Sequence, residues 1–147
     1  KDVKAAIAFF SEAMGIQHFS KPQIIRAHDF DATYKGAPCI AETLVSMAYT
    51  NGTFIELIQP LSGHSMFYDY LEKNPAGGVQ HVAYSTTITN LDKVIAELTD
   101  KGYPVIATYD TPIAKIIFID SYKDVGVFTE IMGITEEGEK VVEKMKS

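Results

Sequence analysis

The sequence has little cysteine, no membrane-length apolar run and no visible signal segment. Cys39 is the single cysteine among 147 residues, so an internal disulfide is excluded and a reducing compartment fits. No apolar stretch approaches the roughly 18 residues that a membrane-spanning helix needs. No basic-then-apolar signal segment is visible. We therefore expect a cytoplasmic protein with no membrane partner.

Clusters of basic residues are also missing. The chain has 13 Lys and Arg against 19 Asp and Glu, which gives a formal net charge of −6. Because binding to phosphates needs clustered Lys and Arg, we expect no nucleic-acid partner. Gly77-Gly78 is not a phosphate loop, since no Lys-Ser or Lys-Thr follows it. No Ser-His-Asp or Cys-His pattern marks a nucleophile.

What is present is typical of one folded domain over residues 1–147. Apolar residues make up 46% and charged residues 22% of the chain, close to the globular average. The length is too short for a barrel of eight βα units, which needs roughly 250 residues. We therefore expect either one domain of ordinary size or two small modules that share one hydrophobic core.

Apolar periodicity predicts helices and strands in alternation. Helices are predicted at Asp2–Met14, at Leu91–Lys101 with Thr89 or Asn90 as cap, and at Thr135–Lys146 within the C-terminal segment 135–147. Ser62–Lys73 is predicted as a short helix or turn, with Ser62 or Ser65 as its cap. Strands are predicted around Ile24-Ile25 and at 40–49, 53–59, 79–86, 103–109, 115–119 and 127–132, with a loop at 31–38. Asn51-Gly52 favours a tight hairpin turn.

Two short matches indicate an internal repeat. Val3–Ala8 resembles Leu91–Ala96, and Gly52–Ile58 resembles Gly126–Met132. The two separations differ, which places a longer loop in the first copy at 31–38. We therefore predict an α+β fold of two βαβββ modules. Module one covers 1–61 and module two covers 76–134.

The repeat also predicts a strand outside the sequence. In the second copy, a strand that contains His81 precedes the helix. The equivalent strand of the first copy would lie before Lys1, where the chain opens without a methionine. We expect that the first strand of module one is missing from this sequence.

Three residues stand out as candidate metal ligands. Glu56 and Glu130 are lone carboxylates in apolar strands, where burial is costly unless the group is paired, protonated or metal-bound. A solvent-facing carboxylate is the alternative for each, and a core histidine bonded to a backbone carbonyl is the alternative for His81. Two carboxylates and one imidazole suit a divalent ion of Mn, Co, Ni, Fe or Zn.

These residues lie in segments that together resemble the vicinal oxygen chelate superfamily. The nearest branch is that of methylmalonyl-CoA epimerase and related glyoxalase-like proteins. The segments are Gly52–Pro60, Phe67–Lys73, Gly77–Ala83 and Gly126–Glu130, and the resemblance spans roughly Lys1–Gly133. It implies the glyoxalase/bleomycin-resistance-like fold of two βαβββ modules around a metal, with ligands at Glu56, His81 and Glu130. A fourth ligand, usually His, falls in the missing strand.

The resemblance also implies a reaction and an assembly. A metal-dependent isomerase, epimerase or lyase would move a proton next to a carbonyl of a small or acyl-CoA substrate. Glu130 is implied as both ligand and catalytic base, and a homodimer is expected. Epimerases of this branch use a second carboxylate near Cys39–Glu42. Glu42 could serve, but Cys39 is best aligned, and one-base chemistry would need no such group.

Two further functions remain open on the same fold. A ring-cleaving dioxygenase would use two His and one Glu on iron, and the carboxylate at Glu56 counts against it. A non-catalytic small-molecule binding or resistance protein would use the aromatic side chains of Phe54, Phe118 and Phe128. Fold alone does not choose among these functions.

Overall fold

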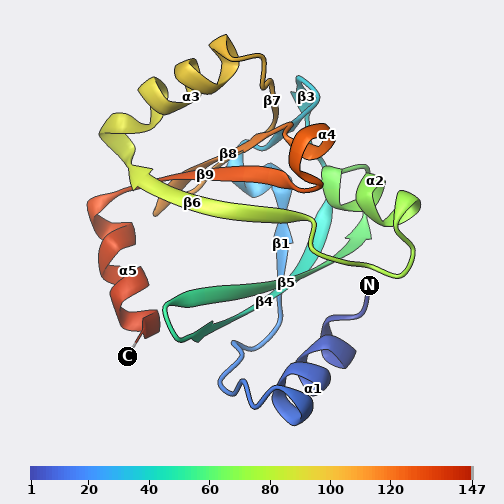
Figure 1. Ribbon diagram of the computed structural model, residues 1–147. Coiled ribbons are helices and arrows are strands. Elements are labelled where there is room, and N and C mark those ends of the chain that lie inside the picture. Colours follow the sequence, from blue (N-terminus) through green and yellow to red (C-terminus); the bar gives the residue numbers. More distant parts are fainter. Residues whose placement is uncertain (147) are drawn as a thin grey trace.

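The computed structural model describes residues 1–146, and Ser147 lies outside the described residues (Figure 1). The first half contains α1 (Val3–Ala13), β1 (Gln23–Arg26), the 3₁₀ turn η1 (Ala27–Phe30), β2 (Thr33–Tyr34), β3 (Ala37–Pro38), β4 (Glu42–Thr50), β5 (Thr53–Ser62) and α2 (Met66–Lys73). The second half contains β6 (His81–Thr87), η2 (Ile88–Asn90), α3 (Leu91–Asp100), β7 (Val105–Asp110), β8 (Ala114–Ile119), α4 (Tyr122–Val125), β9 (Phe128–Ile134) and α5 (Glu136–Lys146).

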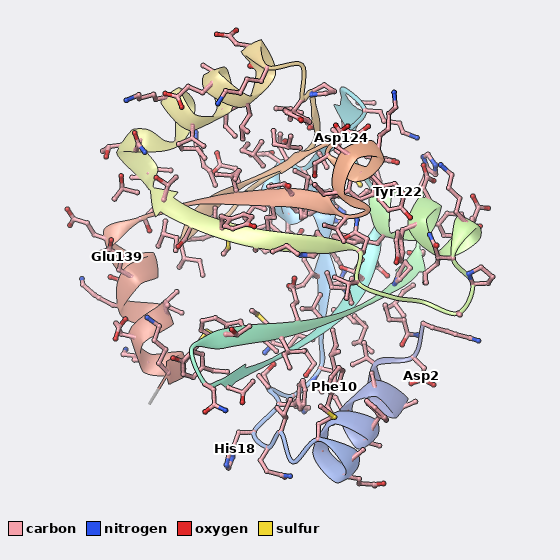
Figure 2. All side chains as sticks on the ribbon, viewed as in Figure 1. Asp2, Phe10, His18, Tyr122, Asp124 and Glu139 are labelled. Atoms are coloured by element: carbon pink, nitrogen blue, oxygen red, sulfur yellow. The ribbon has the colours of Figure 1, made fainter. Side chains whose placement is uncertain are left out.

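Helix α1 covers one face of the first sheet. Asp2 caps it, because its carboxylate accepts a hydrogen bond from the Ala5 N–H at 3.0 Å (Figure 2). Val3 is the buried residue of the helix, and its N–H donates to Oε1 of Gln59 on β5 at 3.0 Å. The predicted helix at residues 2–14 is therefore confirmed, with its first residue as the cap.

The first sheet has the order β1-β4-β5 and is antiparallel. The β4–β5 turn has positive φ angles at Asn51 (46°) and Gly52 (88°), as the Asn-Gly pair predicts. Met47 pairs with Glu56, and Leu44 pairs with Gln59. Because side chains alternate along a strand, the face of Glu56 is opposite to the face that packs against α1.

The second sheet has the order β3-β2-β7-β8-β9-β6. Strand β6 runs parallel to β9, with α3 as the crossover between β6 and β7, so module two is a complete βαβββ unit. Leu91 of α3 packs in a buried cluster with Ile119 and Ile131 on one face of this sheet. In Figure 1, α1 and α3 lie outside the two sheets, which are stacked between them.

The loop predicted at 31–38 is wrong, because part of this segment forms strands. Within the inserted segment 27–41, β2 and β3 form a small hairpin, and β2 pairs with β7 of module two. Pairing with a sheet edge satisfies backbone groups that a loop would leave to solvent. Asp69 of α2 accepts hydrogen bonds from the Tyr34 hydroxyl at 2.6 Å and Lys35 Nζ at 2.8 Å. The insertion therefore ties the two modules together.

The caps of α2 and α3 and the short helix α4 can also be compared with the sequence predictions. Ser65 caps α2, because its side chain accepts from the Tyr68 N–H at 3.2 Å. Asn90, one of the two predicted caps of α3, occupies the N-cap position, but its side chain makes no capping bond and its Nδ2 instead donates to Oγ1 of Thr86 at 3.0 Å. Helix α4 is a single turn without apolar periodicity, so the sequence pattern does not predict it.

The last strands of the two modules, β5 and β9, differ in how many strands they pair with. Strand β9 pairs with β8 on one side and β6 on the other, whereas β5 pairs with β4 alone among residues 1–146. Within the same residues, no helix has the length and apolar character needed to span a membrane. The strand expected before Lys1 stays a prediction.

Candidate metal centre

The three predicted ligands lie together where the two sheets face each other. Nε2 of His81, at the start of β6, is 2.9 Å from Oε2 of Glu130 on β9 and 3.5 Å from Oε2 of Glu56 on β5. One ligand atom from each residue lies within 4.8 Å of the others. Residues from both modules therefore form one polar cluster.

Sheet register places these side chains on the inner face. Glu130 pairs with Phe118 on β8 and with Ala83 on β6, and His81 pairs with Phe128. Phe128 and Glu130 are two residues apart on β9, so they and their partners share a face. The inner position of the cluster thus follows from strand alternation in both sheets.

The cluster is largely enclosed by apolar residues. The side chains of Glu130 and His81 are 7% and 11% exposed, whereas that of Glu56 is 31% exposed. The Phe118 and Phe67 rings lie 5.3 and 6.3 Å from the His81 ring, between centroids. Little water surrounds the imidazole and the Glu130 carboxylate, which strengthens their mutual electrostatic interaction.

Burial and pairing act in opposite directions on His81. Burial lowers the pKa of its imidazole, but hydrogen bonds to Glu130 and Glu56 outweigh this and raise the pKa to about 9. Burial raises the pKa of Glu130, although the His81 hydrogen bond opposes that shift. Without an ion, an imidazolium therefore bridges the two carboxylates at neutral pH.

The distances from His81 to the two carboxylates match the spacing of ligands around a divalent ion. Ligand atoms that bind an ion at about 2.1 Å are about 3.0 to 3.4 Å apart for angles between a right angle and a tetrahedral one. The two His81 distances of 2.9 and 3.5 Å are close to this range. Two carboxylates also balance the charge of a divalent cation once the imidazole is neutral. Glu56, His81 and Glu130 are thus suitable ligands.

The structure does not bring Glu42 to this cluster. Glu42 lies on β4 on the same face as Leu44, toward α1, and its Oε1 accepts a hydrogen bond from Nε of Arg26 at 3.0 Å. Both partners are solvent-exposed, with 36% of the Glu42 side chain accessible. Its predicted role as a second base therefore has no geometric support among the described residues.

Cys39 and Tyr109 lie side by side in the core near the centre. Cys39 is 4% exposed in a cluster of small residues against which Tyr109 packs, and burial raises the pKa of its thiol. Burial also raises the pKa of the Tyr109 phenol, and the carboxylates of Glu56 and Glu130 raise it further. Both groups therefore stay protonated at neutral pH. No sequence pattern marks Tyr109, since its face depends on the β7–β8 register.

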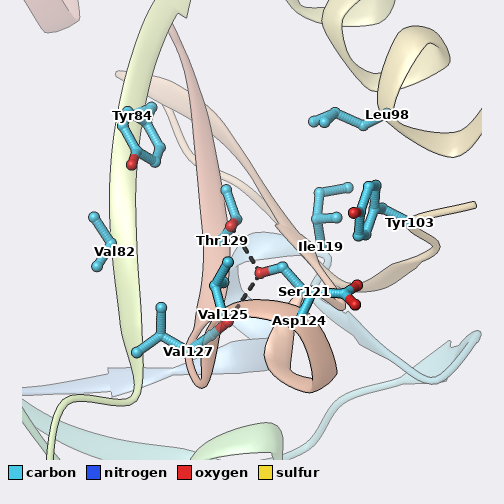
Figure 3. Close-up of a pocket in the computed structure, with 10 residues that line it drawn as sticks. All are labelled: Val82, Tyr84, Leu98, Tyr103, Ile119, Ser121, Asp124, Val125, Val127 and Thr129. Atoms are coloured by element: carbon cyan, nitrogen blue, oxygen red, sulfur yellow. Dashed lines mark hydrogen bonds between the residues drawn. The ribbon is translucent and has the colours of Figure 1, made fainter. Parts of the chain in front are cut away.

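A separate cavity of about 320 Å³ lies on the opposite face of the second sheet (Figure 3). Val82, Thr129 and Ile119 line it beneath α3, and they alternate with the inner-face residues of their strands. The hydroxyl of Ser121 at its wall donates to the Val127 carbonyl at 2.9 Å and is 2.8 Å from Oγ1 of Thr129. None of the candidate ligands lines this cavity.

A family model for the glyoxalase/bleomycin resistance protein/dioxygenase superfamily matches residues 1–119. The chain therefore belongs to this superfamily, as the sequence resemblance predicts. The matched residues contain Glu56 and His81, and Glu130 lies after them. An ethylmalonyl-CoA/methylmalonyl-CoA epimerase of Cereibacter sphaeroides is 30% identical over 117 residues, which are 76% of this chain and 77% of that protein.

Solved structures share the fold. A methylmalonyl-CoA epimerase from Mycobacterium tuberculosis has a TM-score of 0.61 at 19% identity, covering 89% of this chain and 79% of its own. A hypothetical protein from Bacillus halodurans C-125 has a TM-score of 0.60 at 18% identity, with coverage of 89% and 85%. These likenesses confirm the predicted α+β fold.

Proposed function

We propose that this protein moves a proton at the carbon next to the carbonyl of an acyl-CoA substrate, with a divalent ion held by Glu56, His81 and Glu130. The observation that carries the proposal is the cluster of these three residues between the modules. The similarity to the Cereibacter sphaeroides epimerase supports the substrate class. The homodimer implied by the resemblance is part of the same proposal.

Glu130 is the residue proposed to move the proton. It is buried, and a carboxyl whose pKa is raised toward neutrality can both accept and return a proton. Its carboxylate removes the proton from the substrate carbon, and the electron pair moves to the carbonyl oxygen to give an enolate. Return of the proton to carbon restores the carbonyl. A bound divalent ion would act as a Lewis acid that stabilises the negative oxygen.

The surrounding residues suit this chemistry. Phe67 and Phe118 keep water from the His81 ring, which strengthens electrostatic stabilisation of an enolate. Tyr109 stays a neutral hydroxyl on the inner face, because its pKa is raised. A neutral phenol can donate a hydrogen bond to a substrate oxygen without adding negative charge to the site.

The number of bases decides between two forms of the reaction. Inversion at carbon needs a proton acceptor on one face and a donor on the other. Glu42 lies on the α1 face, and Cys39 is a buried thiol. This placement favours one-base isomerisation, exchange or lyase chemistry over two-base epimerisation.

Deuterium incorporation tests the proposal. The Co²⁺-loaded protein is incubated in D₂O with each enantiomer of methylmalonyl-CoA, and mass spectrometry and chiral analysis follow the product. We expect Co²⁺-dependent incorporation of one deuterium at the carbon between the two carbonyls, with retained configuration. Inversion would instead support an epimerase with a second base.

Glu97→Gln is the matched control, because Glu97 is an exposed carboxylate on α3. It should match the wild type, whereas Glu130→Gln should lose exchange. Failure of the wild-type protein to bind any divalent ion would refute the metal-dependent mechanism. Tight binding of the thioester without exchange would favour the non-catalytic binding protein.

A further inference from the structure

The ring nitrogen of His81 that lies away from the carboxylates has its own hydrogen-bond partner. Nδ1 of His81 is 2.6 Å from Oε1 of the adjacent Gln80 side chain. Because an amide oxygen can only accept, this contact requires a proton on Nδ1. Nε2, on the opposite side of the ring, lies toward Glu56 and Glu130. The two ring nitrogens are thus distinguished by what each one faces.

The backbone that carries Gln80 is held at two points. The Tyr70 hydroxyl of α2 donates to the Val79 carbonyl at 3.2 Å, and the Phe128 N–H of β9 donates to the Gln80 carbonyl at 2.9 Å. Both contacts precede the first residue of β6. They hold the backbone of Gln80 in place, and this backbone positions the side-chain amide next to His81.

The amide orientation leaves one buried donor unpaired. Nε2 of Gln80 is buried and has no hydrogen-bond partner among residues 1–146. An unpaired buried N–H is costly and needs an explanation. Its amide oxygen, in contrast, has a short contact with Nδ1. With the amide oriented in this way, its oxygen faces Nδ1 of His81 at the cost of an unpaired Nε2–H.

We propose that Gln80 is a positioning residue that keeps the proton of His81 on Nδ1 and so leaves the Nε2 lone pair for an ion between Glu56 and Glu130. The inference rests on the proposed metal centre. Partners that orient a ligating imidazole through its other nitrogen fix both tautomer and ring orientation, and their loss costs about 10- to 100-fold in metal affinity. Gln80 is not one of the three candidate ligands and acts through His81.

Two variants test whether the hydrogen-bond acceptor of Gln80 matters, rather than the size of its side chain. Gln80→Met keeps a similar length but has no amide oxygen, whereas Gln80→Glu retains an acceptor for the Nδ1 proton. We expect Co²⁺ affinity, measured by competition with a chelator, to fall about 10- to 100-fold in Gln80→Met. Gln80→Glu should stay within about threefold of the wild type or bind more tightly. Equal affinities in all three proteins would overturn the proposal.

A spectroscopic measurement tests the contact without any metal. In the metal-free protein labelled with ¹⁵N-histidine near neutral pH, the Nδ1 proton of His81 should exchange slowly with water. It should remain slow in Gln80→Glu and become at least about tenfold faster in Gln80→Met, as expected when a protecting hydrogen bond is lost. Fast exchange in the wild type would overturn the contact, and this result needs no variant to fold. Because this measurement involves no ion, failure of Co²⁺ binding alone would instead refute the proposed metal centre.

Discussion

The two modules place a glutamate at the same point of the repeat, yet the two carboxylates have different surroundings. Glu130 on β9 has 7% of its side chain exposed, whereas Glu56 on β5 has 31% exposed. Strand β9 is flanked by β8 and β6, and β6 also brings His81 to the cluster. Strand β5 pairs with β4 alone within residues 1–146. Equivalent positions in a repeat therefore do not have equal chemistry.

This difference suggests a division of roles. A carboxylate becomes a stronger base as burial raises its pKa, and Glu130 has that environment. Glu56 is more accessible and faces His81 from the other module. We therefore assign proton transfer to module two, and we assign to module one a ligand that completes the ion site. The following predictions test this division.

Removal of the module-two carboxylate should have the largest effect. At saturating Co²⁺, Glu130→Gln should reduce deuterium exchange by about 10³-fold, since an amide cannot accept the proton. The rate should not recover when Co²⁺ is raised further. The measurement is the initial rate of deuterium incorporation. A variant that retains more than about a tenth of the wild-type rate would show that another group is the base.

The metal-free protein should lose stability as pH rises. The pKa of His81 is raised from its ordinary value to about 9 in the folded state. The stabilisation is therefore fully present below about pH 6.5 and is lost as pH rises toward 9, by roughly 2 to 3 kcal/mol. Urea unfolding with chelator should show this decrease, and His81→Gln should reduce it. If the unfolding free energy of His81→Gln fell with pH as steeply as that of the wild type, the imidazolium bridge would be contradicted.

Removal of the module-one carboxylate should mainly weaken metal binding. Glu56→Gln should lower Co²⁺ affinity by at least the roughly 10- to 100-fold that loss of an outer partner costs. Exchange should then recover substantially at high Co²⁺, unlike in Glu130→Gln. Chelator competition and a Co²⁺ titration of the exchange rate provide the two readouts. If Glu56→Gln and Glu130→Gln behaved alike, the division between modules would fail.

The smallest effect should come from Glu42. This carboxylate lies on the α1 face of module one and pairs with Arg26 in solvent. Exposed ion pairs contribute about 0.2 to 1 kcal/mol, so Glu42→Gln should change the unfolding free energy by no more than that. Deuterium exchange should stay within about twofold of the wild type. A loss of tenfold or more would restore Glu42 as a second base.

The predictable features were those with local patterns or a repeat. The Asn51-Gly52 turn, the α1 and α3 helices and the equivalence of Glu56 with Glu130 could all be predicted from the sequence. The two-residue strand β2 could not, because it is too short for periodicity and its partner β7 is remote in the chain. The contacts of Gln80 and Tyr109 likewise depend on strand register, which sequence pattern alone does not specify.

Lone polar residues in apolar strands and the family resemblance both predicted the candidate ligands, whereas the face of Glu42 needed the structure. Glu42 and Cys39 are three residues apart in the sequence, and both lay near the position expected for a second base. The β4 register places Glu42 toward α1, and the inserted segment buries Cys39 against Tyr109. A charged residue near the right position is therefore weak support for a catalytic role, unless the strand face is known.

The central claim is that Glu56 from one module and His81 with Glu130 from the other hold a single divalent ion. The most direct measurement is anomalous X-ray diffraction from crystals of the Co²⁺-loaded protein. We expect one strong peak within about 2.0 to 2.3 Å of Nε2 of His81 and of an oxygen from each glutamate. A fully loaded protein whose peak lies elsewhere, or touches ligands from only one module, would contradict the claim.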